Sequence, residues 1–418
     1  MSSGGKKGFD TFVEHEALRR VAVDGDCMVF AGRRVTDLAD EVGRTPFYAY
    51  DRDAITARVQ SLREHLPAAL HLHYAMKANP MPAVVEHLTG LVDGLDVASA
   101  GELEVALAAG AAPETISFAG PGKTRQDLSC ALGAGITVNL ESASEMRRLA
   151  ALAAAAGLRG RVAIRVNPDF ELKSSGMKMA GGPKQFGVDA EQVPALLEEL
   201  VGLALDFVGF HIFSGSQNLS ADAIIESQSR TLELAARLAA AAPGPVRVLN
   251  IGGGFGIPYF PKDASLDLGR IGDHLHGVVA QSAGLLPEAV LVVELGRYLV
   301  GEAGIYVCRV VDRKMSRGHT FLVTDGGLHH HLAASGNFGQ VLRKNYPVLI
   351  GNRVHGVERE TASVVGPLCT PLDLLADRVE VAKAQEGDLV VVMQSGAYGL
   401  TASPLGFLSH PPPAEVLV

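Results

Sequence analysis

Hydrophobic and polar positions follow two patterns that take turns along the middle of the chain. Short runs rich in Val, Ile and Leu are followed by longer segments in which apolar residues recur every three or four positions, as in 143–156 and 222–242. The first pattern predicts buried strands and the second predicts amphipathic helices. Strands that alternate with helices in this way indicate parallel strands joined by crossover helices.

The number of strand-like runs predicts the fold. The runs are 70–79, 94–99, 115–120, 136–141, 161–168, 205–216, 246–254 and 290–296. Eight strand–helix units within residues 48–300 predict a (β/α)8 TIM barrel, because such a barrel needs about 250 residues. An open, doubly wound sheet is the alternative that this pattern leaves open.

The pattern of apolar and polar residues changes on both sides of the predicted barrel. Residues 301–418 contain strand-like runs separated by Gly and Pro, with few helical periods, and predict a C-terminal all-β domain. Residues 1–47 form an N-terminal segment in which the strand-like stretch 27–35 is expected to pair with the β domain. Residues 1–10 are typical of a flexible leader.

Composition and charge narrow the class of protein. The chain has 418 residues, with 47% hydrophobic and 20% charged residues, which is typical of a globular fold. Its net charge of −9, without a long basic run, argues against a nucleic-acid partner. No apolar run reaches the roughly 20 residues of a membrane span. Four widely spaced cysteines and no signal-like start predict reduced thiols in the cytoplasm.

Three groups at the ends of predicted strands are candidates for chemistry, because barrel active sites lie at that face. Lys77 closes the first strand, where apolar and aromatic neighbours would disfavour a charged amine and suit a Schiff base. Gly252–Gly256 (GGGFG) follows the seventh strand and offers backbone N–H groups to a phosphate. Glu294 ends the eighth strand and can pair with a protonated ring nitrogen. Each has an ordinary structural explanation alone, but together they predict a pyridoxal phosphate site.

Other motifs are weaker. The sequence GPGKT (120–124) is similar to a nucleotide-binding loop, but Ser117 stands where that loop needs glycine. Ile257 stands where a dinucleotide-binding GxGxxG motif needs its third glycine. The run His329–His331 does not predict a metal site, because adjacent residues on a strand point to opposite faces.

With these residues assembled, the chain resembles the fold-type III pyridoxal-phosphate decarboxylases, the family of diaminopimelate, ornithine and arginine decarboxylases. The resemblance covers nearly the whole chain and implies an alanine-racemase-like barrel with a C-terminal β domain. It rests on the motifs YAMKAN (74–79), LDVASAGEL (95–103), FHIFSGSQ (210–217), NIGGGFGIPY (250–259), ELGRYLV (294–300), GPLCTPLD (366–373) and GAYG (396–399).

The resemblance also implies roles for individual residues. Lys77 would form the Schiff base, CO2 would leave to give a quinonoid, and Cys369 from the partner subunit of a homodimer would donate the proton at Cα. The residues implied to bind the cofactor are Lys77, His211, Phe213, Ser216, Gly253, Gly254, Glu294, Gly296, Arg297 and Tyr398. Those implied to bind an amino-acid substrate are Arg297, Thr370, Asp373 and Tyr398.

Departures from the family pattern bear on the substrate. Thr370 stands where the family carries an acidic residue that grips a distal amine, and Phe213 replaces the histidine that stacks on the ring. Leu295 replaces a proline, and no arginine-containing RPxLY segment is recognisable within 325–342. Free diaminopimelate is therefore not favoured as the substrate.

The long, basic and Gly-rich loop 173–187 is expected to follow the fifth strand at the barrel mouth. The composition of this loop resembles that of the corresponding loop in family members that act on aminoacyl groups tethered to an acyl carrier protein. We therefore predict a decarboxylase of an amino acid or an aminoacyl conjugate. An alanine-racemase-like isomerase is one alternative, although it needs a tyrosine base where this chain has Cys369. A non-catalytic pyridoxal-phosphate-binding protein is the other, although it resembles the barrel alone.

Overall fold

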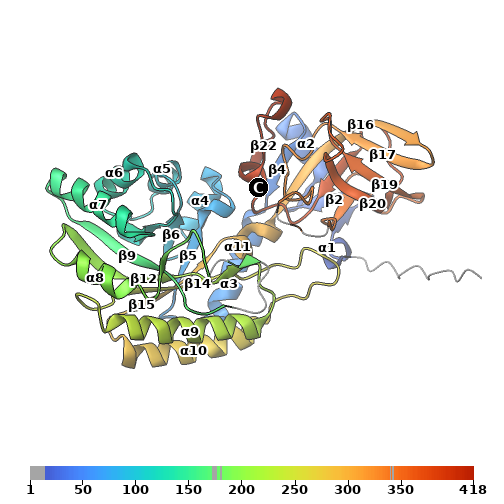
Figure 1. Cartoon of the computed structure of the whole chain (residues 1–418). Coiled ribbons are helices and arrows are strands. Elements are labelled where there is room, and N and C mark those ends of the chain that lie inside the picture. The colour runs from blue at the N-terminus through green and yellow to red at the C-terminus, as the bar shows by residue number, and fades with distance from the viewer. Residues whose placement is uncertain (1–14, 172–176, 179–180, 339, 341–342) are drawn as a thin grey trace, which may run out of the picture.

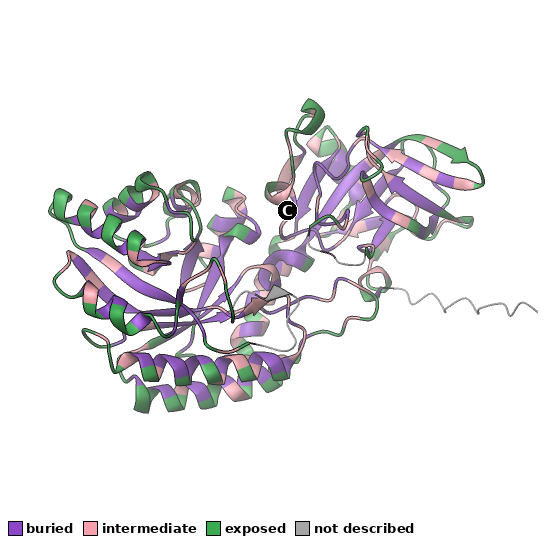
Figure 2. Cartoon of the chain, viewed as in Figure 1, coloured by how far each residue is buried: buried purple, intermediate pink, exposed green. Residues whose placement is uncertain are grey.

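The computed structural model describes residues 15–171, 177–178, 181–338, 340 and 343–418. A barrel ringed by helices lies beside a domain made mainly of strands (Figure 1). Burial is concentrated on the strands of both parts, whereas the outer faces of the helices are exposed (Figure 2). The predicted leader, residues 1–10, lies outside the described residues.

Eight parallel strands form the barrel, in the order in which they occur along the chain. They are β5 (His71–Ala75), β6 (Gly94–Val97), β7 (Ile116–Phe118), β8 (Thr137–Leu140), β9 (Gly160–Asn167), β12 (Leu205–Ile212), β14 (Val248–Gly253) and β15 (Val290–Leu295). Pairing of β15 with β5 and of β8 with β9 closes the ring. The predicted barrel is confirmed, and the open sheet is excluded because the first and last strands pair.

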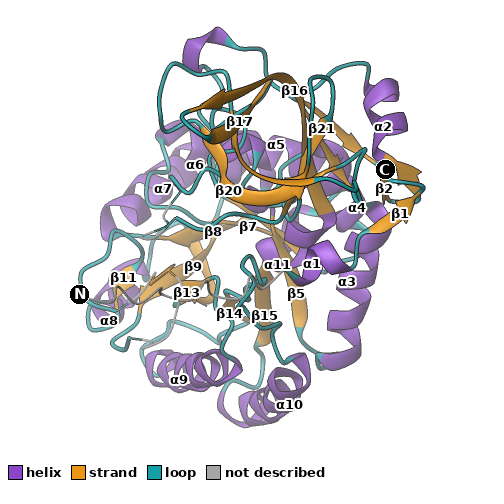
Figure 3. Ribbon diagram, turned by 90° about the vertical axis from the view of Figure 1, so that its right-hand side faces the viewer, coloured by secondary structure: helices purple, strands orange, loops and turns teal. Residues whose placement is uncertain are grey.

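Helices wrap the outside of the barrel (Figure 3). They are α3 (Arg52–His65), α4 (Pro82–Thr89), α5 (Ala100–Ala108), α6 (Arg125–Ala134), α7 (Ala143–Ala156), α8 (Val193–Leu200), α9 (Ala221–Ala239), α10 (Leu268–Leu285) and the short α11 (Arg297–Val300). Several begin at Ser or Thr residues whose side chains accept the backbone N–H three residues on, as at Ser99, Ser142 and Thr124. Within the described part of the chain, no helix is long and apolar enough to cross a membrane.

Three short strands lie at the barrel mouth. β11 (Val188–Asp189) extends the sheet beside β9, and β10 (Met177–Lys178) pairs with β13 (Gly215–Ser216). The predicted loop 173–187 is therefore tied to the barrel in part, although residues 172–176 and 179–180 lie outside the described residues.

The predicted C-terminal β domain is confirmed, and its strands join in one large sheet. Its strands are β16 (Gly304–Ser316), β17 (His319–Thr324), β18 (Val348–Ile350), β19 (Arg359–Val365), β20 (Leu374–Ala382) and β21 (Leu389–Val392), joined by β4 (Phe47–Tyr50) and β22 (Ala414–Leu417). The sequence predicts strands at its apolar runs 304–312, 319–327, 360–366 and 388–396, and these runs overlap β16, β17, β19 and β21. It missed β18 and β22, which are short, and β20, whose apolar run is interrupted by charges.

The position of strand β4 shows that the barrel does not start at residue 48, as the sequence predicts. Residues 48–50 were placed at the start of the barrel, but β4 pairs with β16 and β22 in the β domain. All four residues of β4 are buried, and a short run that is apolar on both faces does not reveal which sheet it joins. The barrel therefore begins with α3.

The N-terminal segment contacts the β domain without joining its large sheet. β1 (Ala22–Asp24), β2 (Cys27–Phe30) and β3 (Arg33–Arg34) form a small antiparallel sheet of their own, flanked by α1 (Glu16–Arg19) and α2 (Val35–Val42). The Met28 N–H donates to the Gly351 carbonyl at 2.6 Å, and Cys27 and Phe30 pack in one cluster with residues of β16. We keep the division into residues 1–47, 48–300 and 301–418 as a proposal, with the correction at β4.

The run His329–His331 does not lie on a strand, contrary to the expectation. It occupies a turn after β17, and all three side chains are at most 1% exposed. Burial lowers the pKa of His331 to about 3, and its Nε2 lies 2.9 Å from the Ser395 hydroxyl. These histidines therefore belong to the interior of the β domain.

Candidate active site

Lys77 lies on the 3-10 turn η1 (Met76–Ala78) directly after β5, at the barrel mouth. In the single chain its side chain is exposed, so the expected enclosure by apolar neighbours is not found. The turn carries Lys77 beyond the buried strand, while Met76 and Ala78 on either side are buried. One aromatic neighbour is present, because the Lys77 amine lies 5.8 Å from the centre of the Phe213 ring.

One pocket gathers most of the predicted cofactor residues. It is lined by Ala75, Lys77, Phe213, Ser216, Gln217, Gly254, Phe255, Glu294, Leu295, Gly296, Arg297 and Tyr398. Two of the predicted residues, His211 and Gly253, do not line it and instead contact Glu294, which does. The lysine, the carboxylate and the glycine loop that the sequence singled out therefore face a common space between the barrel and the β domain.

Glu294 is the buried anion of this pocket and is 6% exposed. Its Oε2 accepts a hydrogen bond of 2.9 Å from the Asn250 amide and lies 2.9 Å from His211 Nε2. Burial by itself would raise the pKa of Glu294, but His211, followed by Lys77 and Arg165, outweighs burial and holds this pKa well below its usual range. Glu294 is therefore ionised and suited to hold a protonated ring nitrogen.

The glycine loop leaves no room for side chains. A Cβ on Gly254, whose φ is +74°, would lie 2.0 Å from the Gly215 carbonyl oxygen. A Cβ on Gly253 would lie 2.0 Å from the Glu294 carbonyl oxygen. The backbone of Gly253 and Gly254 is thus packed against β15 and the β12–α9 connection, next to Ser216, and only glycine fits at these two positions.

Arg297 comes from the barrel and Tyr398 comes from the β domain, and both line the pocket. The Arg297 guanidinium lies 4.6 Å from the centre of the Tyr398 ring and donates to the Tyr259 hydroxyl at 2.8 Å. The Tyr398 N–H donates to the Ala78 carbonyl at 2.7 Å, next to Lys77. The β domain is therefore fastened directly to the turn that carries the lysine.

A row of polar side chains, of which His73, Asp96 and Asn139 are buried, crosses the barrel interior and is not predicted by the sequence analysis. His73 Nδ1 lies 3.2 Å from Asp96 Oδ1, the Ser117 hydroxyl donates to the same oxygen at 2.6 Å, and the Asn139 amide donates to Ser117 at 3.1 Å. Burial would lower the pKa of His73, but Asp96 and then Glu294 raise it above its usual value. The available signal was a polar residue inside each apolar run of β5 to β8. Asn250 within β14 was missed in the same way.

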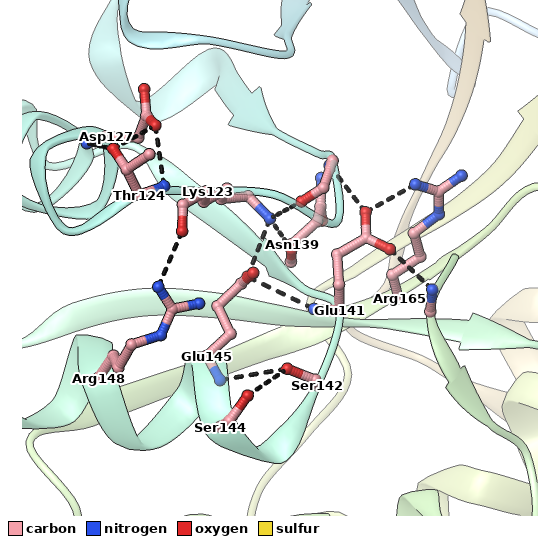
Figure 4. Close-up of polar contacts among 12 residues, drawn as sticks. Lys123, Thr124, Asp127, Asn139, Glu141, Ser142, Ser144, Glu145, Arg148 and Arg165 are labelled. Carbon is pink, nitrogen blue, oxygen red and sulfur yellow. Dashed lines mark hydrogen bonds and ion pairs between the residues drawn. The ribbon is translucent and has the colours of Figure 1, made fainter. Parts of the chain in front are cut away.

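The GPGKT motif has a structural role. The Lys123 amine is 3% exposed and donates to the carbonyls of Gly120 and Asn139, at 2.8 Å each, and to Glu145 at 2.9 Å (Figure 4). Burial lowers the pKa of Lys123, and Glu145 opposes that change. Because its amine is consumed by these contacts, this lysine does not serve a nucleotide phosphate.

Glu141 joins three segments of the barrel mouth. Its carboxylate accepts from the Gly120 N–H, the Gly187 N–H and Arg165 Nη1, at 2.7 Å each (Figure 4). The Arg165 guanidinium also lies 4.9 Å from the centre of the Phe186 ring. The described end of the loop 173–187 is therefore anchored to the barrel wall at the ends of β8 and β9.

The residues predicted from the motif GPLCTPLD lie apart from the pocket of their own chain. Cys369 is exposed and Thr370 is half-buried, and neither lines that pocket. Asp373 is only 3% exposed, and its two carboxylate oxygens accept backbone N–H groups of Leu328 and Leu368. Asp373 is therefore held by its own chain and lies outside that chain's pocket, and its part in substrate binding stays a prediction.

The pocket fits pyridoxal phosphate by its own chemistry. An amine for the aldehyde, a buried anion for the pyridinium and the backbone of Gly254 with the Ser216 side chain for the phosphate all line one pocket. A barrel with this combination at the carboxyl ends of its strands defines the class of pyridoxal-phosphate enzymes.

Comparison with known proteins identifies the family. The model of the family described as pyridoxal-dependent decarboxylase, pyridoxal binding domain, matches residues 52–301. The chain belongs to this family. It is a pyridoxal-phosphate-dependent carboxy-lyase that acts on an amino acid or an aminoacyl conjugate. The racemase and non-catalytic alternatives are set aside, because the matching family and relatives are decarboxylases.

Three similar proteins illustrate the range of the family. The chain is 40% identical over 379 residues (89% of this chain, 88% of the relative) to the L-glutamyl-(BtrI acyl-carrier protein) decarboxylase of Niallia circulans. It is 33% identical over 398 residues (94% and 91%) to the diaminopimelate decarboxylase of Aquifex aeolicus. The crystal structure of diaminopimelate decarboxylase from Helicobacter pylori complexed with L-lysine superposes with a TM-score of 0.80 at 26% identity, covering 92% of this chain and 94% of that chain.

Proposed function

We propose that this enzyme removes CO2 from an α-amino acid that is tethered to an acyl carrier protein. The observation that carries the proposal is Thr370, which replaces the acidic residue that would bind the distal amine of a free diamino acid. The relative from Niallia circulans, whose name states a glutamyl group on a carrier protein, supports it. A carrier-bound substrate does not need a charged side chain to bind its distal end, because contacts between the enzyme and the carrier protein supply the binding energy.

The reaction restricts how the substrate is attached. The α-carboxylate leaves as CO2, so it must be free, and the thioester must therefore use a carboxyl group in the side chain. A dicarboxylic amino acid such as glutamate meets this condition. The bond between Cα and the carboxyl carbon breaks, and one proton takes the place of CO2 at Cα. The product is an ω-aminoacyl thioester on the same carrier.

The pocket assigns a task to each residue in this reaction. When bound, the cofactor acts as the electron sink for the charge that remains at Cα. Lys77 would hold the cofactor through its amine, and the ionised Glu294 would favour a protonated ring nitrogen. Phe213 offers its apolar face to the ring. Cys369 of the partner subunit donates the proton at Cα.

A panel of substrates tests the proposal through the release of CO2. We expect the highest kcat/KM for an acyl carrier protein charged with L-glutamate through its side-chain carboxyl group. The matched comparisons are the same thioester on free pantetheine, free L-glutamate, diaminopimelate, ornithine, lysine and arginine. A response to free diaminopimelate alone would contradict the proposal, because it would show that Thr370 does not exclude a free diamino acid.

We also propose that the enzyme is a cytoplasmic homodimer with shared active sites. The described cysteines Cys27, Cys130, Cys308 and Cys369 are all free, which suits a reducing compartment. Cys369 is exposed and does not line its own chain's pocket, and the apolar side chains of Leu372 (59% exposed) and Phe338 (41% exposed) lie close by. A partner subunit packed on this side of the β domain would bury both side chains and bring Cys369 to the neighbouring pocket.

Mixing two inactive variants tests the shared site. Lys77→Ala lacks the lysine, and Cys369→Ala lacks the thiol. If each site takes its lysine from one chain and its thiol from the other, dissociated and reassociated mixtures regain activity at about one quarter of the sites. Each variant mixed with itself is the control. Mixtures that remain as inactive as the separate variants would show that both residues act within one chain.

A further inference from the structure

The turn that carries Cys369 is compact. The Thr370 N–H donates to the Leu368 carbonyl at 2.8 Å, the Asp373 N–H donates to the Thr370 carbonyl at 3.2 Å, and the Gly366 N–H donates to the Asp373 carbonyl at 3.2 Å. Cys369 is exposed at its apex, whereas Asp373 at its end is buried. The direction of the thiol therefore depends on how the base of this turn is held.

The Asp373 carboxylate holds that base. Its Oδ2 accepts the Leu368 N–H at 2.8 Å, next to Cys369 in sequence. Its Oδ1 accepts the Leu328 N–H at 2.6 Å, from the loop after β17. Hydrogen bonds to a carboxylate are shorter and stronger than neutral ones, so this side chain ties the turn firmly to a second, distant loop.

The surrounding backbone is shaped for this carboxylate. A Cβ on Gly327 would lie 2.1 Å from Asp373 Oδ1, and a Cβ on Gly366 would lie 2.3 Å from Oδ2. The two glycines come from the two loops that Asp373 joins. Only residues without side chains leave space for the carboxylate to reach both backbone N–H groups.

We propose that Asp373 is a positioning residue that sets the direction of the Cys369 thiol by fastening its turn to the loop at Gly327–Leu328. The inference rests on the proposed function, in which Cys369 protonates Cα. A misplacement of about 1 Å in a catalytic group can cost about 10²-fold in rate. The buried aspartate would therefore influence proton delivery without touching the substrate.

A double-mutant cycle in the dimeric holoenzyme tests this role. Asp373→Asn keeps the shape of the side chain but turns an amide group toward one of the two N–H donors. We expect kcat to fall about 10²-fold in the wild-type background. In the Cys369→Ala background, we expect the same substitution to change kcat by less than about 2-fold, because nothing remains to be positioned. A residue that only stabilises the fold would show equal losses in both backgrounds.

Asp388 provides the matched control. It is also 3% exposed in the β domain, and its carboxylate accepts from the Gln385 N–H and the Asn352 amide at 2.8 Å each. We expect Asp388→Asn to lower the melting temperature while kcat of the folded enzyme stays unchanged. Asp373→Glu is the second variant, in case Asp373→Asn does not fold. It keeps the charge and shifts it by one methylene, and we expect a smaller loss of kcat that also disappears without Cys369.

The outcomes separate the two proposals. An additive loss of kcat in Asp373→Asn and Asp373→Glu overturns the positioning role and leaves the proton donor in place. A Cys369→Ala variant with unchanged kcat overturns the proton-donor role itself, and this inference with it.

Discussion

Replacing Lys77 with alanine will give a folded chain that cannot hold the cofactor covalently and releases CO2 at least about 10³-fold more slowly than wild type. The reason is that Lys77 is the amine that we propose for the bond to the cofactor, and it lines the same pocket as Glu294. The purified variant will lack the yellow colour of the wild type, as measured by visible absorbance. Initial rates of CO2 release at saturating substrate give the second readout.

Folding will not be affected, because the Lys77 side chain is exposed and makes no hydrogen bond with the part of the chain that the structure describes. Lys262→Ala is the control, since Lys262 is also exposed but does not line the pocket. A Lys77→Ala enzyme that stays yellow and active would remove the basis for assigning the cofactor to this pocket.

Replacing Glu294 with glutamine will lower kcat by about 10²- to 10³-fold, the usual loss when a preorganised electrostatic contact is removed. The amide has nearly the same shape, but it cannot hold a proton on the ring nitrogen. It also disturbs the contacts of 2.9 Å with Asn250 and His211 that the carboxylate makes now. The negative charge of the Glu294 carboxylate favours the bound cofactor. The variant lacks this charge and will therefore also lose cofactor more quickly on dialysis.

The control for Glu294→Gln is Glu288→Gln, an exposed residue just before β15. We expect it to retain wild-type kcat and wild-type absorbance. If Glu294→Gln kept full activity while its cofactor spectrum stayed unchanged, the carboxylate would have no part in the chemistry, and the pocket would need another partner for the ring.

The architecture was predictable because it repeats. Each barrel strand is a short apolar run and each helix has a periodic apolar face, so closing eight units into a ring needs no detail of side chains. The error at β4 arose because a strand buried on both faces carries no information about its partner sheet. The histidine turn was misplaced on a strand for a related reason, since three buried polar residues in a row have no periodicity to interpret.

The site was predictable where chemistry demands rare residues at strand ends, as for Lys77, Glu294 and the glycine loop. It was not predictable where burial decides the role. Asp373 stands beside a candidate catalytic cysteine in sequence, but its carboxylate is turned inward onto two backbone N–H groups. Asn250 and His211 act through Glu294, and that depends on distances across neighbouring strands that a linear pattern does not contain.

The most direct test of the central claim is to locate the cofactor attachment chemically. Borohydride reduces the carbon–nitrogen double bond between a lysine and pyridoxal phosphate to a stable single bond, and peptide mass spectrometry then finds the labelled lysine. Our account predicts one phosphopyridoxyl group per chain, on the peptide that contains Lys77. Label on any other lysine, or an unlabelled chain after reduction in excess cofactor, would contradict it.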